Sequence, residues 1–540
     1  MSVAVVATAT WTSAGDLSAL MDRLDCGLPV TSAPPYALTG LPARPCGIVA
    51  GLDRERPAEV LLEQVVREVV AGRPAAGTGL VVGTASGNVC GPWERWNRRR
   101  LSGEVADEEG TGRDAPALRV AARLGLGGPV TTVSVACVSG AAALGVGAGW
   151  LRDGLCERVV CVGLDALSEF VHAGFAGLGA VGAGTPRPFR ADRDGLMLGE
   201  GAAALLLEAR PETPPLAWLR ASRSTCDAHH LTTPEPNGRG AVAAIRAALL
   251  EAGLHPDAVD GVSVHGTATR ANDAMEAAAL SEVFGDSPPL WAVKAILGHT
   301  MGAAGAIEAA VAVEALRRGR IPTPLVPGPA GSKDLAAALR VGPRDGPARV
   351  LLAMSSAFGG THVANVFALQ PGPAAGRDLV VVEGPVFEGL VARSDLAWPD
   401  APAAWSRATD YVRAGLLAVR GLVELGQDLP DDAAIVLASR TCCREVDRAH
   451  HERLVSEGSG RASRRTFVGT MPGAPVFEAS LLWGVRGPAV AFVDGRARAE
   501  EEARRLVRHG AVRVAVAVSV EAERIGGPSL VSAASYRRAP

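Results

Sequence analysis

The chain has 540 residues, a length that predicts two to four domain-sized units and a large core. Nearly half of the residues (48%) are hydrophobic but only 4% are aromatic, so Ala, Val, Leu and 64 glycines dominate, which indicates a tightly layered α/β protein and excludes a disordered chain. A formal net charge of −3 without a dominant basic cluster argues against nucleic-acid or membrane-surface partners.

The nine cysteines form no CxxC pair and show no Cys/His spacing typical of zinc, so we expect neither a disulfide framework nor a metal site. The N-terminal MSVAVVATATWTSAGD lacks a basic segment followed by an apolar one, and no run of eighteen apolar residues occurs. These features predict a reducing, cytoplasmic setting.

Short, nearly uncharged apolar runs alternate with Ala/Leu/Arg stretches of helical period along the chain. Strands covered by helices on both faces have this pattern, which therefore predicts stacked α/β layers. The expected strands are Ser2–Ala9, Gly79–Thr84, Val130–Ala136, Arg158–Leu164, Ala202–Glu208 and Val350–Met354, and the expected helices are Ala58–Val70, Gly140–Arg152, Arg239–Ala252 and Gly302–Arg318.

Two Pro/Gly-rich joints interrupt this pattern, at Pro211–Pro215 and at the QPGPAAG segment that begins at Gln370. They predict units at 1–210 and 211–370, a linker at 371–376 and a third unit at 377–540. Residues 405–522 follow the same order of helix, strand, insert and strand as Ala58–Leu167, with few identities. The third unit is therefore interpreted as a partial internal repeat, with convergent α/β composition as the alternative.

Cys137 stands where a β-rich run meets a helix of small residues, in VTTVSVACVSGAAALG. A helix N-terminus carries partial positive charge and free N–H groups, which favour a thiolate and can bind an oxyanion. The pattern predicts an activated, exposed sulfur, although a lone cysteine between Ala and Val is more often an inert core residue. Cys161, inside the run RVVCVGL, is interpreted as such a core residue.

Two histidines follow in segments that suit proton transfer or oxyanion donation. His265 ends an apolar run in SVHGTAT, beside a flexible glycine and two hydroxyls. His299 follows in VKAILGHTMG, five residues after Lys294, which is one of only two lysines in the chain. A lysine kept in so arginine-rich a chain indicates that a compact ammonium is needed there. A surface lysine with a buried, satisfied histidine is the alternative.

These segments, with the loop SSAFGGTHVAN and TPRPFRADRDGLMLGEGAAALLLE, resemble the condensing enzymes of the thiolase fold, and most closely the elongating β-ketoacyl-acyl-carrier-protein synthases. The resemblance covers residues 1–370 in order. It implies a thiolase-like layered α-β-α-β-α fold built of two similar halves, followed here by the C-terminal α/β partial repeat.

The resemblance also implies roles for individual residues. Cys137 matches the nucleophile that accepts the acyl group from a carrier thioester, and His265 and His299 match the pair that drives malonyl decarboxylation and stabilises the enolate. The remaining matches are Lys294 as electrostatic support, Glu308 in the polar network beneath the site, Thr267 and Thr269 on the phosphopantetheine arm, Phe358 as the gate with Gly359 and Gly360 beside it, and the N–H groups of Cys137 and Phe358 as the oxyanion hole.

The chain departs from the family pattern at the gate and in the tail. Ala357 and His362 stand where the family commonly shows Gly and Asn, which puts the accepted chain length in doubt. The tail segment that aligns with VSVACVSG reads AFVDGRAR, so residues 377–540 resemble a chain-length factor without a nucleophile. The adjacent Cys442 and Cys443 lack a histidine motif and are not expected to replace it.

The sequence therefore predicts a β-ketoacyl synthase that condenses a malonyl-carrier with an acyl group on Cys137, in fatty-acid or polyketide biosynthesis. A thiolase-fold acyltransferase to an alcohol or amine and a non-catalytic partner are the alternatives. The resemblance implies no cofactor or metal, an acyl carrier protein as partner, and a homodimer paired through the strand before the nucleophile. A tail that covers this edge within one chain is the competing expectation.

Overall fold

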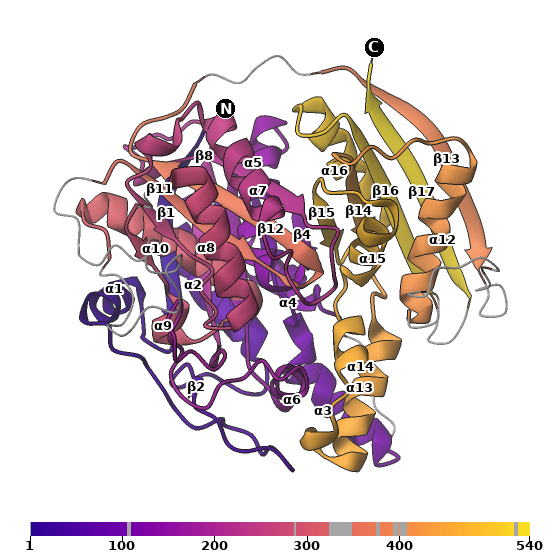
Figure 1. Ribbon diagram of the computed structural model, residues 1–540, viewed down its shortest axis with the longest axis horizontal. Helices are drawn as coiled ribbons and strands as arrows, with labels where there is room; N and C mark the ends of the chain where they lie inside the picture. Colours follow the sequence, from indigo (N-terminus) through magenta and orange to yellow (C-terminus); the bar gives the residue numbers. More distant parts are fainter. Residues whose placement is uncertain are drawn as a thin grey trace.

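The computed structural model describes residues 2–104, 110–285, 288–322, 348–373, 379–391, 398, 405, 408–522 and 528–539. Residues 374–376 of the predicted linker lie outside this description. Within the described residues, fifteen strands form one sheet in the order β10-β9-β11-β12-β8-β1-β7-β5-β3-β4-β15-β14-β16-β17-β13 (Figure 1). The sheet consists of three blocks of five strands, one from each predicted unit.

The middle block, β1-β7-β5-β3-β4, comes from the N-terminal unit. In it β1 and β7 are antiparallel, β7 and β5 are antiparallel, and β5, β3 and β4 are parallel. The parallel strands are buried on both faces, which explains their continuous apolar runs. The bounds are β1 Val3–Thr12, β3 Thr78–Gly83, β4 Val130–Val133, β5 Arg158–Asp165 and β7 Gly201–Glu208.

The other two blocks repeat this succession of two antiparallel pairs and two parallel pairs. It recurs in β8-β12-β11-β9-β10 of the second unit and in β13-β17-β16-β14-β15 of the tail. The layered fold of two similar halves and a C-terminal partial repeat is therefore confirmed. The bounds are β8 Ala217–Cys226, β9 Gly261–Ser263, β10 Leu290–Trp291, β11 Val350–Ser356, β12 Thr361–Ala368, β13 Val381–Val391, β14 Ala434–Ala438, β15 Ala489–Phe492, β16 Val514–Ala522 and β17 Ser529–Arg538.

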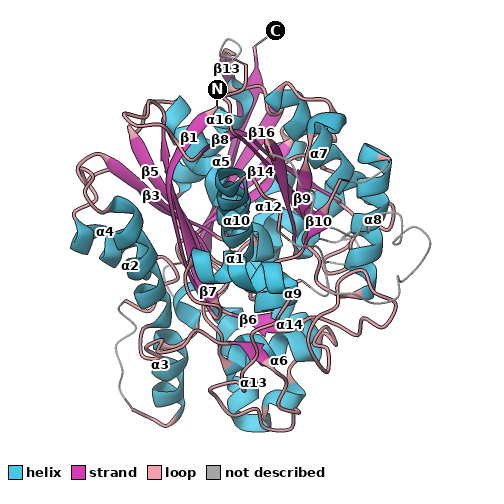
Figure 2. Ribbon diagram, turned by 90° about the vertical axis from the view of Figure 1, so that its left-hand side faces the viewer, coloured by secondary structure: helices cyan, strands magenta, loops and turns pink. Residues whose placement is uncertain are grey.

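Helices cover the blocks on both faces (Figure 2). Helices α5 and α10 pack against each other between the first two blocks, while α2 and α4 cover the outer face of the first block, and α7 and α8 that of the second. In the tail, Phe387 of β13 packs on Gly421 of α12 and the next residue, Glu388, pairs with Arg496 of α16, so these helices lie on opposite faces. The bounds are α2 Pro57–Val70, α4 Ala115–Leu124, α5 Ser139–Arg152, α7 Arg239–Ala252, α8 Arg270–Phe284, α10 Ala304–Arg318, α12 Asp410–Glu424 and α16 Arg496–Arg508.

The sequence rules that predict these elements hold closely, with small differences at their ends. The expected strand Val130–Ala136 ends at Val133, because Ala136 has φ +49° in a turn before α5.

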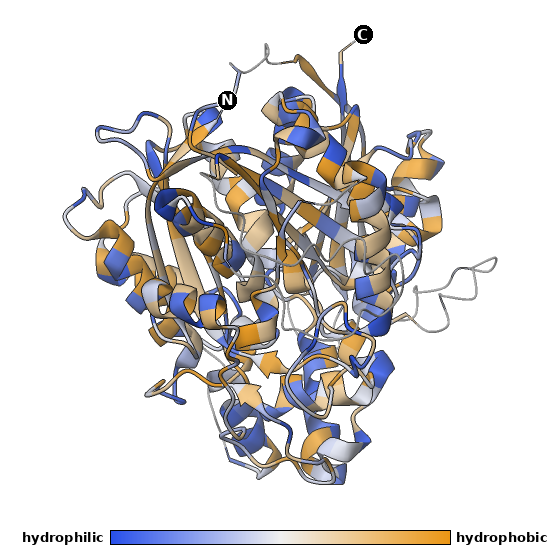
Figure 3. Ribbon diagram, turned by 60° about the vertical axis from the view of Figure 1, so that its left-hand side comes forward, coloured by the Kyte–Doolittle hydropathy of each residue, from blue (hydrophilic) through white to orange (hydrophobic). Residues whose placement is uncertain are grey.

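Figure 3 shows helices that carry both hydrophobic and hydrophilic residues, as amphipathic outer helices require. The remaining elements are α1 Leu17–Cys26, α3 Pro92–Leu101, α6 Glu169–Gly177, α9 Lys294–Leu297, α13 Arg444–Glu457, α14 Arg464–Gly469, α15 Ala474–Trp483, β2 Cys46–Gly47 and β6 Leu198–Gly199.

The tail joins the first block where β15 runs antiparallel to β4, with Phe492 opposite Val133. Ser134 donates its N–H to the carbonyl of Ala491 (2.8 Å), and Val493 donates to Thr132 (2.9 Å). The edge that a homodimer would use is thus occupied within the chain. The competing expectation, a tail that covers this edge, matches the structure.

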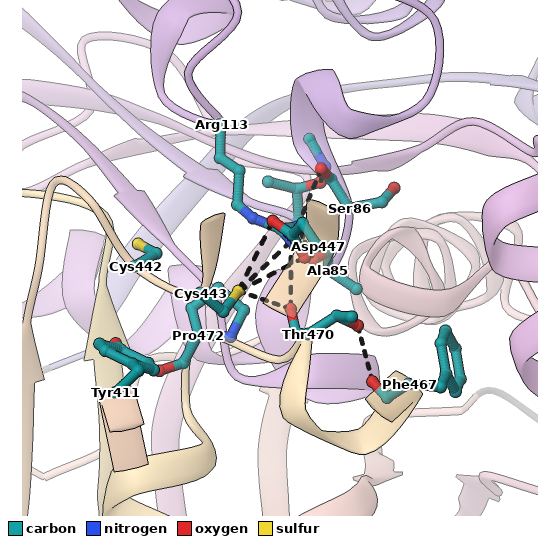
Figure 4. A network of polar contacts seen from close by, with 12 residues as sticks. Ala85, Ser86, Arg113, Tyr411, Cys442, Cys443, Asp447, Phe467, Thr470 and Pro472 are labelled. Carbon is teal, nitrogen blue, oxygen red and sulfur yellow. Dashed lines mark hydrogen bonds and ion pairs between the residues drawn. The ribbon is translucent and has the colours of Figure 1, made fainter. Parts of the chain in front are cut away.

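A buried ion pair adds a second contact between tail and body. Arg113 donates to both carboxylate oxygens of Asp447 on α13 (2.9 and 2.8 Å) and to the carbonyl of Thr470 (3.1 Å) (Figure 4). Its other terminal nitrogen donates to the carbonyls of Ala85 and Ser86, in the loop after β3 (2.9 and 3.0 Å). One guanidinium therefore links the loop after β3 to two segments of the tail.

Within the residues that the structure describes, no helix combines the length and the hydrophobicity needed to cross a membrane.

Candidate active site

A cavity of about 1070 Å³ lies between the first two blocks and the tail. Its wall contains most of the side chains that the sequence singled out, although they are up to 223 residues apart in the chain. The predicted residues in the wall are Cys137, His265, Thr267, Thr269, His299, Phe358 and Gly360. This convergence makes the cavity the candidate active site.

Cys137 is positioned by a sharp turn between β4 and α5. The turn is a 3-10 segment, Ala136–Val138, and α5 begins at Ser139, whose hydroxyl accepts the N–H of Val135 (2.9 Å). Gly140 brings α5 close to the loop after His299, because a Cβ there would lie 2.6 Å from the carbonyl oxygen of Gly302. The small residues of this helix therefore bring the cysteine and the second histidine together.

The expected exposed, activated sulfur is wrong for the resting state. Cys137 is only 5% exposed, and burial raises the pKa of its thiol to about 12, while the charge of Lys294 works in the opposite direction. Desolvation outweighs the helix N-terminus, which sequence spacing alone could not reveal. The cavity therefore holds a protonated thiol until its proton is transferred.

His265 and His299 face each other, with ring centroids 5.4 Å apart and ring planes at 90°. Burial, followed by the charge of Lys294, lowers the pKa of each ring well below its ordinary value, so both imidazoles are neutral. Nδ1 of His299 accepts the N–H of Met301 (3.3 Å), which places the ring hydrogen on Nε2. Neutral rings of this kind can donate an N–H without protonating a carbanion.

Lys294 and Glu308 form a buried pair beneath the histidines, with 2.5 Å between Nζ and Oε1. Ser355 donates its hydroxyl to the other carboxylate oxygen of Glu308 (3.1 Å). Burial raises the pKa of Glu308 and Lys294 opposes this shift. Neither Lys294 nor Glu308 is part of the cavity wall, and the charge of Lys294 reaches the site by lowering the pKa of both histidines.

The residues predicted at the gate face in two directions. Phe358 and Gly360 belong to the cavity wall. Thr267 and Thr269, predicted to contact the phosphopantetheine arm, also belong to it, with their hydroxyls 2.9 Å apart. Gly359 instead faces the tail, because a Cβ there would lie 2.3 Å from the ring of Phe477 in α15 and its φ is +82°. Gly359, which the resemblance places beside the gate, is therefore not part of the cavity wall and packs on the tail.

Sequence reasoning missed two features of the site. Asp165 ends β5 and accepts hydrogen bonds from Ser86 N (2.9 Å) and Gly302 N (2.7 Å), which ties the histidine loop to the first block. Its signal was a carboxylate at the end of an otherwise apolar strand. The tail supplies part of the wall from α12, α14 and α15, including Val412, Val468 and Leu481. No local pattern indicates these contacts.

The tail has no thiol where the repeat would place a nucleophile. The turn between β15 and α16 carries Asp494, Gly495 and no cysteine. Burial raises the pKa of the Cys442 thiol to about 12, and the Cys443 thiol donates to the carbonyl of Thr470 (2.8 Å) near Arg113 (Figure 4). Neither cysteine belongs to the cavity wall. In the described parts of the chain, no three His, Cys, Asp or Glu side chains gather as metal ligands would.

Comparison with known proteins agrees with this architecture. Two family models match, the β-ketoacyl synthase N-terminal domain over residues 63–212 and the β-ketoacyl synthase C-terminal domain over residues 216–326. The 3-oxoacyl-[acyl-carrier-protein] synthase 2 of Synechocystis sp. is 35% identical over 221 residues, which are 37% of this chain and 52% of that protein. The tetracenomycin polyketide synthase ketoacyl synthase alpha subunit of Streptomyces glaucescens is 36% identical over 265 residues, 46% of this chain and 62% of that protein.

The chain thus spans 52% and 62% of the length of these two curated relatives. The solved structure of the PfaC keto synthase–chain length factor shares the fold over 99% of this chain and 78% of its own, with a TM-score of 0.79 and 15% identity. Fold and site together define a protein with the thiolase-like fold. Within that class, residues 63–212 and 216–326 belong to the β-ketoacyl synthase family.

Proposed function

We propose that this protein catalyses decarboxylative condensation of a malonyl group with an acyl group held on Cys137, both delivered as thioesters on an acyl carrier protein. The observation that carries the proposal is the convergence of Cys137, His265 and His299 on one cavity. The name of the Synechocystis relative, a 3-oxoacyl-[acyl-carrier-protein] synthase, supports the same reaction and partner. The reaction needs no cofactor besides the carrier's phosphopantetheine.

The reaction begins with acyl transfer. The sulfur of Cys137 attacks the carrier thioester, a C–S bond forms, and the pantetheine thiolate leaves with the proton of the cysteine thiol. The backbone N–H groups of Cys137 and Phe358 are the proposed oxyanion donors. Because burial raises the pKa of the free thiol to about 12, the proton has to leave the sulfur during the attack, and the departing pantetheine thiolate is the proposed acceptor.

Condensation follows when malonyl thioester enters. Loss of CO2 leaves an enolate, whose oxygen accepts N–H donation from His299 Nε2 and from His265. The enolate carbon then attacks the acyl-Cys137 carbonyl, a C–C bond forms, and the cysteine thiolate leaves. Lys294 stabilises the developing negative charge from below while Glu308 holds its ammonium in place.

The tail takes part as a bound partner in this proposal. It has no nucleophile, it closes the edge of β4, and it lines the cavity with Val412, Val468 and Leu481. The resemblance to a chain-length factor supports a role in limiting the acyl chain.

All nine cysteines are free in the structure, which supports a reducing, cytoplasmic setting.

The full chain, supplied with malonyl-carrier and an acyl-carrier primer, tests the proposal by CO2 release and product mass. Cys137→Ala is expected to form no acyl-enzyme and no product, and His265→Ala with His299→Ala is expected to abolish CO2 release. Cys156→Ala, a half-buried cysteine outside the cavity wall, is the matched control and keeps activity.

Product formation without CO2 release would favour the acyltransferase alternative, and no reaction would favour a non-catalytic role. CO2 release unchanged when Cys137 and His299 are both replaced by Ala would refute the assignment of the site. The complete set of Cys137, His265 and His299 argues against a non-catalytic role for residues 1–370. This argument does not depend on the role of the tail.

A further inference from the structure

The cavity contains a second group of polar side chains that the proposed condensation does not use. Ser356, at the end of β11, and His362, at the start of β12, are direct partners across the antiparallel strands. The next strand, β8, pairs with β12, and Asp227 follows directly after its end. The ends of three adjacent strands therefore fix the three side chains in a row.

The distances suit proton transfer along this row. Ser356 Oγ lies 2.9 Å from Nδ1 of His362, and Nε2 of His362 lies 3.1 Å from Oδ1 of Asp227. The other oxygen of Asp227 accepts the N–H of Glu235 (3.0 Å). Gly240 leaves room for the pair, because a Cβ there would lie 2.3 Å from Oδ1 of Asp227.

The charge of Asp227 favours one direction for the hydrogen bond between Ser356 and His362. Nε2 of His362 and Oδ1 of Asp227 are within ion-pair distance but make no hydrogen bond in the structure. Burial acts to raise the pKa of Asp227, but His362 and the Glu235 N–H hold it below its ordinary value, so the carboxylate is ionised. An ionised carboxylate draws the ring hydrogen of His362 to Nε2 and leaves Nδ1 as an acceptor. The Ser356 hydroxyl then donates to Nδ1, as a serine nucleophile does to its general base.

Access distinguishes Ser356 from its neighbour Ser355. Ser356 belongs to the cavity wall and is 5% exposed, the same fraction as Cys137. Ser355 points to the opposite face of β11 and donates to Glu308. The asparagine that the family commonly shows at position 362 could orient a hydroxyl but could not accept its proton. The base is therefore a property of this chain.

We propose that Ser356, His362 and Asp227 form a second acyl-accepting site, which hydrolyses acyl thioesters held in the cavity. Ser356 Oγ attacks the thioester carbonyl, the C–S bond breaks, and the serine proton passes through His362 Nδ1 to the leaving thiolate. Water then attacks the serine ester, again with His362 as base, and yields a free carboxylic acid and the serine hydroxyl. No reactant other than water is needed.

A fluorophosphonate probe tests this site directly, since it forms covalent adducts with base-activated serines. The full-length Cys137→Ala variant is used so that the thiol cannot react. Tandem mass spectrometry of the tryptic peptide 350–377 is expected to locate the adduct on Ser356. Adding His362→Asn is expected to slow labelling about 100-fold, a typical effect of losing a general base. Ser355→Ala is the matched control and keeps the label.

A second readout follows an acyl-pantetheine thioester in the same variants. The Cys137→Ala protein is expected to release free acid, and adding Ser356→Ala is expected to abolish this release while circular dichroism stays unchanged. An unlabelled Ser356, or labelling that His362→Asn leaves unchanged, overturns the inference. The inference takes its thioester from the proposed function, but CO2 release by the wild type is measured separately, so the two can fail independently.

Discussion

Val133 and Phe492 face each other across the antiparallel contact of β4 and β15. Val133 lies four residues before Cys137 in the chain. Through this contact, a strand pairing that the family resemblance assigns to two subunits is made inside one chain. A tethered partner is always present at a fixed ratio and at a high effective concentration. The structure therefore couples the integrity of the catalytic turn to the folding of the tail.

Asp447→Ala is predicted to destabilise the packing of the tail against residues 1–370. The substitution leaves the buried guanidinium of Arg113 without its carboxylate, and breaking such a pair costs about 3–5 kcal/mol. Chemical denaturation is expected to show this loss of unfolding free energy. Glu457→Ala on the same helix removes only the exposed pair with Arg453 and is expected to change stability by less than about 1 kcal/mol. Equal effects of the two substitutions would contradict the prediction.

Alkylation of Cys137 by iodoacetamide is predicted to accelerate about tenfold for each pH unit between pH 7 and 10. The pKa of about 12 leaves the thiolate a small fraction that grows across this whole range. Lys294→Met is expected to slow the reaction at every pH, because the lysine charge lowers the pKa of the thiol. Peptide mapping separates Cys137 from the other cysteines. A rate that levels off near pH 8 would show that the thiol is activated in the resting protein.

Val468→Phe is predicted to shorten the product. Val468 extends from the tail into the cavity wall, and a larger side chain there removes space for the end of the acyl chain. The rate with the longest accepted primer is expected to fall about tenfold, which is the scale of the effect of one excess methylene group in a closed pocket. Val455→Phe on the exposed side of α13 is the control. Unchanged product masses in Val468→Phe would exclude the tail from chain-length selection.

The predicted residues that meet in the cavity share one property. Cys137, His265, His299 and Phe358 lie in short connections just after β4, β9, α9 and β11, so the local pattern of apolar run and small residues marks them. Local patterns also predicted the five strands of the first block and β11 as apolar runs. The order of the strands in the sheet was not predicted, and the layered fold of two similar halves was implied by the family resemblance.

What could not be predicted depends on contacts between distant segments. Burial of Cys137 arises from the whole cavity, and it reverses the effect that a helix N-terminus would have on the thiol. Gly359 packs on Phe477, more than a hundred residues later, and His362 meets Asp227, more than a hundred residues earlier. A departure such as His362 can be noticed in the sequence, but its partner is defined only by the sheet.

Glu94→Gln is predicted to remove a pH dependence from the stability of the protein. Glu94 lies in the first turn of α3 and accepts the N–H groups of Gly91 and Phe170, and burial raises the pKa of its carboxyl to about 7. The ordinary value is about 4.3, so the folded state binds the proton more tightly than the unfolded state does. The resulting stabilisation is complete below about pH 4 and is lost as the pH rises through 7.

Denaturant titrations between pH 5 and 8 measure this effect. The difference in unfolding free energy between wild type and Glu94→Gln is expected to move against the wild type by up to about 3 kcal/mol as the pH rises. Glu59→Gln is the control of opposite sign: burial acts to raise the pKa of Glu59, but Arg123 and Arg119 lower it overall. Its contribution is lost only at acidic pH, so it adds no slope in this range. Parallel curves for wild type and Glu94→Gln would show that Glu94 is ionised in the folded protein at pH 5, against the direction that its burial dictates.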